Sequence, residues 1–179
     1  MSVSNWMLNT PPRLCQLQIY KRDEGVFGCW ATAAEMVVKW KSRYSYFARP
    51  SFQSYLDDQT DGSGASYESF ILDWFDAWGF ESQGRGGFGT WSPQEMATTL
   101  RDKGPVVAIG AFGGTAGSSV SLGGQVHAIA VYGYAESFGG IYYIDPWDAA
   151  SKRMSLSEFR NKLWGSYNAV LARIPNYRA

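Results

Sequence analysis

The sequence has one histidine, two cysteines and no excess of either charge, and each of these shortages excludes a class of protein. Lys+Arg and Asp+Glu each total 16, so the formal net charge is zero. Proteins that bind nucleic acids usually carry a basic excess that releases counterions from phosphates. We therefore expect no DNA or RNA partner. No apolar run approaches the roughly 20 residues of a transmembrane helix, so no membrane insertion is expected.

The two cysteines are too few for a disulfide framework and suit a reducing compartment better. The sequence alone leaves a Cys15–Cys29 bridge open. The first residues are neither basic nor apolar, so no secretory signal peptide is predicted. We expect synthesis in the cytoplasm, and any action in another cell would need a dedicated secretion system.

What the sequence does contain is enough apolar material for one core. Hydrophobic residues make up 45% and charged residues 18%, which is the balance of a globular protein. A chain of 179 residues fits one compact domain and is too short for two ordinary ones. No repeat or long linker divides it, so a single domain over residues 1–179 is predicted.

The first half of the chain has helical patterns. Apolar residues recur with helical spacing over residues 29–43 and again over residues 67–78. A third helix is predicted to begin at Ser92, because Ser92 and Glu95 form a capping-box pattern around a proline suited to the first helical position. This helix should end at Gly104, which a proline follows.

After residue 105 the pattern changes to short β-like runs separated by glycine-rich or polar connections. One helix interrupts them, from about Leu156 to Trp164, and a second capping-box pattern opens it. Helices followed mostly by strands indicate an α+β fold, and short connections favour an antiparallel sheet. The predicted strands are Val106–Ile109, His127–Tyr132, Ile141–Ile144 and Ala169–Ala172.

Two residues could carry nucleophilic chemistry. His127 is the only histidine, so any acid–base step that uses imidazole near neutral pH must use it. Cys29 begins the first predicted helix, where unpaired N–H groups and the helix dipole favour a thiolate and lower the thiol pKa. Both residues also have plain structural interpretations, as a hydrogen-bonded histidine and a small buried apolar residue.

Asp145 is the candidate partner of His127. It ends the predicted strand 141–144 and lies 18 residues after His127 (145 − 127), which is enough for two antiparallel strands and a turn. Such a hairpin would bring the carboxylate to the imidazole, where it would fix one tautomer and stabilise the cation. The alternative is an ordinary strand-ending aspartate before a proline turn. Asp148 is a weaker candidate for the same role.

Three segments, taken together, resemble the papain-like cysteine peptidases, in particular bacterial ones related to the double-glycine peptidases of bacteriocin export and to secreted effector proteases. They occur in the family's order, with a change from helix to strand between the first and the second. They are Gly28-Cys-Trp-Ala-Thr-Ala33, Gly124-Gln-Val-His-Ala-Ile-Ala-Val-Tyr-Gly-Tyr134 and Tyr142-Tyr-Ile-Asp-Pro-Trp147.

The resemblance implies a papain-like fold with a helical lobe over about residues 1–104, an antiparallel sheet lobe over about residues 105–179, and an active-site cleft between them. It also implies a catalytic triad, in which Cys29 attacks the scissile carbonyl, His127 serves as base and acid, and Asp145 orients the imidazole. No cofactor is expected. The cysteines and the histidine fit no common zinc spacing, so no metal is expected either.

One position departs from the family's pattern. Papain relatives often carry a glutamine about six residues before the cysteine, which stabilises the oxyanion, and this sequence has Asp23 there. An ionised carboxylate cannot donate a hydrogen bond. Gln18 is therefore our candidate oxyanion donor, with backbone N–H groups as the alternative.

Three tryptophans are candidates for substrate contact. Trp30 follows the candidate nucleophile and has a structural role on the first helical turn as its alternative. Trp91 follows a glycine-rich stretch, and Trp147 lies two residues after Asp145. The resemblance implies that Trp147 also shields the contact between His127 and Asp145 from solvent.

The resemblance implies a cysteine endopeptidase that acts on proteins or peptides as a bacterial toxin or effector domain, with a preference for cutting after small residues such as Gly-Gly. The resemblance also implies a cognate inhibitor or immunity protein. Three alternatives stay open: a peptidoglycan amidase or endopeptidase, a deamidase or acyltransferase that shares the triad, and a catalytically silent papain-like binding domain.

Overall fold

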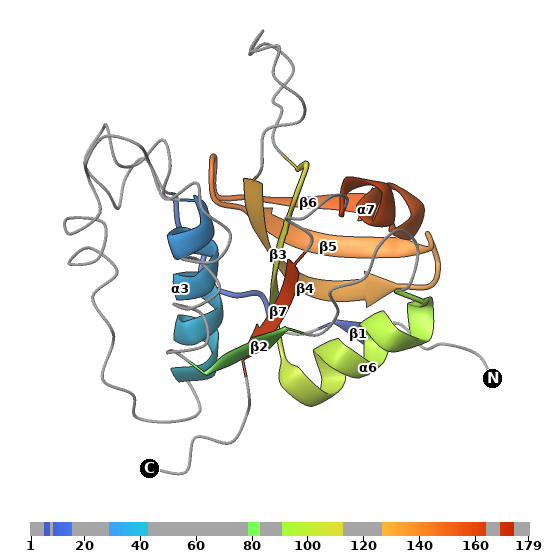
Figure 1. The fold of residues 1–179 in the computed structure, drawn as a ribbon, viewed down its shortest axis with the longest axis horizontal. Coiled ribbons are helices and arrows are strands. Elements are labelled where there is room, and N and C mark those ends of the chain that lie inside the picture. Colours follow the sequence, from blue (N-terminus) through green and yellow to red (C-terminus); the bar gives the residue numbers. More distant parts are fainter. Residues whose placement is uncertain are drawn as a thin grey trace, which may run out of the picture.

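The computed structural model describes residues 6–7, 9–15, 29–42, 79–82, 91–112, 127–163 and 169–173, and all structural statements concern these residues. They form an antiparallel sheet with helices on both faces (Figure 1). The strands are β1 (Trp6–Met7), β2 (Phe80–Ser82), β3 (Val106–Gly110), β4 (His127–Ala135), β5 (Gly140–Asp145), β6 (Ala150–Ser155) and β7 (Ala169–Arg173), and the helices are α3 (Cys29–Ser42), α6 (Pro93–Lys103) and α7 (Leu156–Lys162).

The strands are hydrogen-bonded in the order β2-β7-β3-β4-β5-β6, and β1 pairs with β4 beside β3. Every pairing is antiparallel. This confirms the predicted α+β class and the antiparallel sheet. The four predicted strands are confirmed with small changes at their ends, whereas the short strands β1 and β2 and the edge strand β6 were not predicted.

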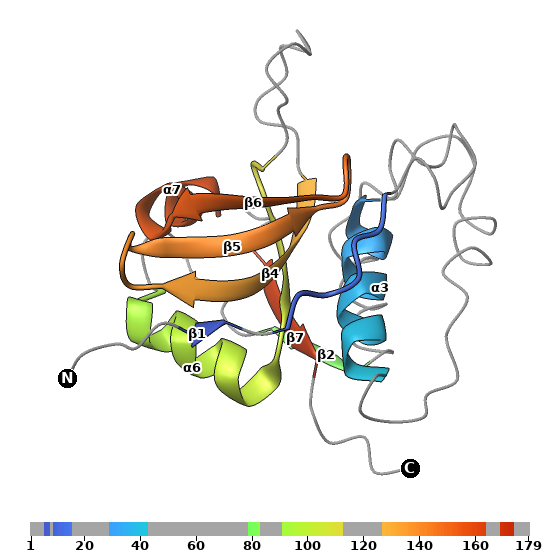
Figure 2. The same ribbon diagram turned by 180° about the vertical axis from the view of Figure 1, so that it is seen from behind.

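Helix α3 covers one face of the sheet, and α6 and α7 cover the other (Figures 1 and 2). Strand β3 is apolar on both faces because it is covered on both. Its side chains alternate, as the two-residue period of a strand requires. Val107 and Ile109 pack with α3, whereas Val106 and Ala108 pack with α6 and α7.

The start of α6 follows its sequence signature. The backbone N–H of Ser92 donates to Glu95 Oε2 at 2.6 Å, and the N–H of Glu95 donates to Ser92 Oγ at 3.1 Å. This reciprocal pair is the predicted capping box. The helix ends at Lys103, before Gly104, whose φ of 84° favours glycine. A Cβ on Gly104 would also lie 2.8 Å from the Trp40 ring, so the predicted end is confirmed for two physical reasons.

The other predicted helices have different outcomes. The helix over residues 29–43 is α3, and the one from about Leu156 is α7, with Ser155 Oγ accepting the N–H of Glu158 at 3.0 Å. The helix predicted over residues 67–78 lies outside the described residues. None of the described helices has the length and apolar character to cross a membrane.

Elements that precede residue 104 also take part in the sheet and in its cover. Strands β1 and β2 belong to the sheet, and α6 packs on it through Met96 and Leu100, although all three precede residue 104. The reason is that α6 buries its apolar face against the same core as α7. Of the described helices, α3 alone lies on the opposite face. That residues 1–179 make one domain stays a prediction.

Candidate active site

Strands β4 and β5 place His127 and Asp145 together. His127 is the first residue of β4 and Asp145 the last of β5, so antiparallel pairing brings both to the same end of the sheet. The turn between the strands includes Gly139, whose φ is 65°. His127 Nε2 lies 2.7 Å from Asp145 Oδ1. The predicted hairpin is therefore present, and it brings the Asp145 carboxylate to the His127 imidazole.

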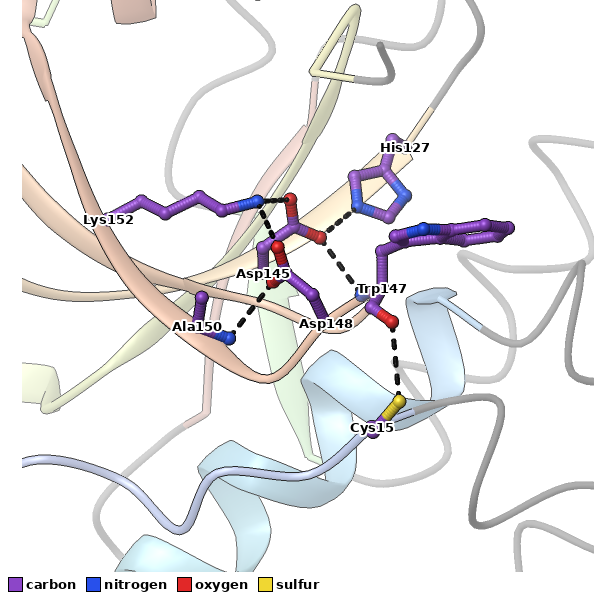
Figure 3. A network of polar contacts seen from close by, with 7 residues as sticks. All are labelled: Cys15, His127, Asp145, Trp147, Asp148, Ala150 and Lys152. Atoms are coloured by element: carbon purple, nitrogen blue, oxygen red, sulfur yellow. Dashed lines mark hydrogen bonds and ion pairs between the residues drawn. The ribbon is translucent and has the colours of Figure 1, made fainter. Parts of the chain in front are cut away.

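Asp145 is held on both carboxylate oxygens (Figure 3). Oδ1 also accepts the backbone N–H of Trp147 at 2.9 Å, and Oδ2 accepts from Lys152 Nζ at 2.7 Å. Burial raises the pKa of this carboxyl, but the hydrogen bonds from His127 and Lys152 outweigh it and leave the pKa well below its usual range. Asp145 is therefore ionised, and its orientation toward His127 is fixed.

Cys29, the first residue of α3, faces the same imidazole. It is partly buried beside the core under α3. Burial raises the pKa of the thiol, and the charge and hydrogen bond of His127, with the N–H groups of Ala128 and Trp30, more than reverse that effect. The net pKa of Cys29 is lowered. The predicted tendency of this position to favour a thiolate is thus reinforced by a cation on β4.

The imidazole is stabilised in its charged form from both sides. Burial lowers the pKa of His127, but the Cys29 thiolate and the Asp145 carboxylate raise it to about 10. Because Nε2 is bonded to Asp145, Nδ1 is the ring nitrogen available to the Cys29 sulfur. Both pKa shifts favour a thiolate–imidazolium pair over a neutral thiol and a neutral imidazole. Such a pair combines a nucleophile with a positioned proton donor.

The turn from Pro146 to Ala149 connects β5 to β6 next to this pair. The N–H of Ala150 donates to Asp148 Oδ1 at 2.9 Å, and Ala149 has a φ of 57°, which is unusual for a residue other than glycine. The Cys15 thiol donates to the Trp147 carbonyl at 3.3 Å, so the segment over residues 9–15 supports this turn (Figures 2 and 3).

Both cysteines are free thiols, so the disulfide that the sequence left open is absent. No group of three metal-ligating side chains occurs within the described part of the chain. Gln18 and Asp23, on which the oxyanion prediction depends, lie outside it. The backbone N–H of Cys29, at the first position of α3, is in the described part and remains a candidate donor.

The three candidate tryptophans differ in how far their side chains are exposed. Trp147 is 39% exposed, and its backbone N–H donates to the carboxylate that holds His127, so its side chain is accessible next to the site (Figure 3). Trp91 is 6% exposed in the core under α6 and α7, where its carbonyl accepts Arg160 Nε at 2.6 Å. Trp30 is 5% exposed in the core under α3. A substrate role for Trp91 and Trp30 is therefore withdrawn, because packing covers both indoles.

Lys152 is the site residue that sequence reasoning missed. It lies on β6, which the sequence did not predict, and joins the site through Asp145. Its spacing of four residues from Asp148 was a visible signal, but that spacing indicates an ion pair in a helix rather than across a turn.

The structure thus combines a cysteine at the start of a helix, an imidazole at the start of a strand and a carboxylate that holds the imidazole. This is the arrangement expected of a papain-like cysteine protease. A family model described as papain-like cysteine protease AvrRpt2 matches residues 9–164. The chain belongs to this family, which is that of a bacterial effector. A comparison with curated proteins found no match.

Proposed function

We propose that this protein is a cysteine endopeptidase with Cys29 as nucleophile, His127 as acid and base, and Asp145 as the group that holds the imidazole. The observation that carries the proposal is the contact of His127 with both other residues: Nε2 lies 2.7 Å from Asp145 Oδ1, and Cys29 interacts with the imidazole through its charge and a hydrogen bond. Membership of a protease family supports the reaction class.

The proposed reaction uses the ion pair directly. The Cys29 thiolate attacks the carbonyl carbon of a peptide bond and forms a tetrahedral oxyanion. His127 then gives its Nδ1 proton to the leaving amine, and a thioester on Cys29 remains. Neutral His127 takes a proton from water, which attacks the thioester and releases the acid and the thiolate. Asp145 keeps Nε2–H as a donor throughout, so that the proton exchanged with substrate is the one on Nδ1.

The oxyanion needs donors at the start of α3. We propose the backbone N–H of Cys29 as one donor and the side chain of Gln18 as the second. Loss of one such donor typically lowers turnover about 10²–10³-fold. The Gln18 part of the proposal is therefore testable by substitution with glutamate, which has nearly the same shape and accepts without donating when ionised.

The substrate is proposed to be a protein of a target cell, reached by injection from the producing bacterium, because the family is that of an effector. The exposed side chain of Trp147 is the proposed contact for residues on the leaving-group side, since the backbone of Trp147 bonds the carboxylate that holds the proton donor (Figure 3). Cleavage after small residues such as Gly-Gly, and a cognate inhibitor in the producing cell, rest on the resemblance to double-glycine peptidases and toxins.

The test compares protein N-termini in a target-cell lysate after incubation with the wild type, Cys29→Ala or His127→Ala. We expect new N-termini with the wild type and none above background with either variant. Purified cell-wall sacculi are incubated in parallel. Release of muropeptides without new protein N-termini would replace the proposal with the peptidoglycan amidase alternative.

A further inference from the structure

Lys152 reaches the site from the side of Asp145 that faces away from His127. Its Nζ lies 2.7 Å from Asp145 Oδ2, while His127 Nε2 lies 2.7 Å from Oδ1. Lys152 pairs with Tyr143 across β5 and β6, two residues along the ladder from Asp145, so its side chain runs beside the strand toward the carboxylate (Figure 3). The carboxylate is therefore shared between an imidazole and an ammonium group.

The lysine is itself held in place. Its Nζ lies 2.7 Å from Asp148 Oδ2, and Asp148 is fixed in turn by the N–H of Ala150. The Lys152 side chain is 30% exposed, whereas that of Asp145 is 11% exposed. Exposed ion pairs contribute little to stability because water screens them. This pair differs because one partner is mostly buried and also contacts the only histidine of the chain.

We propose that Lys152 is a positioning residue that acts on His127 through Asp145: its charge offsets part of the carboxylate's charge and thereby keeps the imidazolium proton transferable. The inference rests on the proposed function. A general acid works best when its pKa is near the working pH, and an uncompensated carboxylate 2.7 Å away would hold the imidazolium proton more tightly.

The surrounding groups are consistent with this role. Cys29 on α3 and Asp145 on β5 both stabilise the imidazolium. Three other groups near the site carry no positive charge: Asp148 in the turn, Tyr143 on β5 and Glu158 on α7. The pKa of Tyr143 responds to the charges of Lys152, Asp145, Glu158 and Asp148. Lys152 is a second cation that contacts Asp145, beside the imidazolium, so its removal should strengthen the hold of the carboxylate on the His127 proton.

The test uses the fact that the chain has one histidine, so its imidazole NMR signal needs no assignment. His127 is titrated in a Cys29→Ala background, which removes the coupled thiol. Lys152→Gln keeps a hydrogen-bond donor and removes the charge, whereas Lys152→Arg keeps the charge. We expect Lys152→Gln to raise the pKa of His127 by about half a unit to one unit, as for one charge removed from a partly exposed site, and Lys152→Arg to leave it unchanged.

The matched control is Lys162→Met. Lys162 forms an ion pair with Glu158 at 3.7 Å on α7, so this variant loses the same charge in another i,i+4 pair and should not shift the titration. If Lys152→Gln does not fold, Lys152→Met replaces it, with the same expected shift. No shift in the Lys152 variant, a downward shift, or an equal shift in the control would overturn the inference.

A kinetic measurement separates this inference from the proposed function. On a peptide taken from the lysate experiment, Lys152→Gln should lower kcat about tenfold with little change in KM, move the alkaline limb of the pH profile upward, and be rescued by Lys152→Arg. If the wild type cleaves nothing but the NMR shift occurs, the proposed function fails and the effect of Lys152 on His127 stands. If cleavage occurs without the shift, the inference about Lys152 fails alone.

Discussion

The ionisation of Cys29 gives the sharpest chemical prediction. Cys15 is first replaced by alanine, so that Cys29 is the one thiol left to alkylate. An ordinary thiol with a pKa of about 8.5 is only about 0.3% thiolate at about pH 6. The pKa of Cys29 is lowered by His127, so a larger share of its sulfur should be thiolate at that pH than in an ordinary cysteine. Full ionisation raises the reactive fraction about 300-fold, and the weaker nucleophilicity of a more acidic thiol takes back part of this gain.

We therefore expect iodoacetamide to alkylate the wild-type thiol at about pH 6 at least about tenfold faster than that of His127→Ala. The wild-type rate should change less steeply between about pH 6 and 8 than that of His127→Ala, because a lowered thiol pKa moves the loss of thiolate to lower pH. The rate in His127→Ala should rise steeply across the same interval. Alkylation of the wild type that follows an ordinary thiol, and does not change with His127→Ala, would refute the ion pair.

Three further predictions follow from the described contacts. Asp145→Asn should lower kcat about 10²–10⁴-fold. It should also move the alkaline limb of the pH profile to lower pH, because loss of the carboxylate lowers the pKa of His127; an unchanged limb would contradict this. Ala149→Gly should raise the free energy of unfolding by about 0.5 kcal/mol, because removing the steric strain of a side chain at positive φ outweighs the entropy cost of glycine. The control Ala150→Gly, in β6, should lower the melting temperature. Ser92→Ala should cost about 1 kcal/mol in urea unfolding, with Ser92→Thr as the control, and equal stability of the two variants would count against the capping box.

The parts of the site that sequence reasoning predicted are those encoded locally. Cys29 begins a helix whose apolar period is visible, and His127 and Asp145 begin and end strands separated by a glycine turn. Each position therefore follows from a short pattern, and antiparallel pairing of the two strands brings His127 and Asp145 together. The capping box of α6 and the Ser155 N-cap of α7 were readable for the same reason.

The parts that it missed depend on contacts distant in sequence. Strand β6 has exposed residues at alternate positions and lies at the sheet edge, so its composition does not identify it and Lys152 was not connected to Asp145. Trp91 looked accessible beside a glycine-rich stretch, but α6 and α7 bury it. Strands β1 and β2 are two and three residues long, which is too short for a periodicity to show.

The central claim is that the Cys29 sulfur becomes covalently linked to the substrate. The direct measurement is the intact mass of the protein after rapid mixing with a cleaved peptide and acid quenching, followed by mapping of the modified residue. The account predicts a thioester on Cys29, carrying the N-terminal part of the peptide, that is absent in Cys29→Ala. Peptide cleavage that persists in Cys29→Ala, or an acyl group mapped to Cys15 instead, would contradict it.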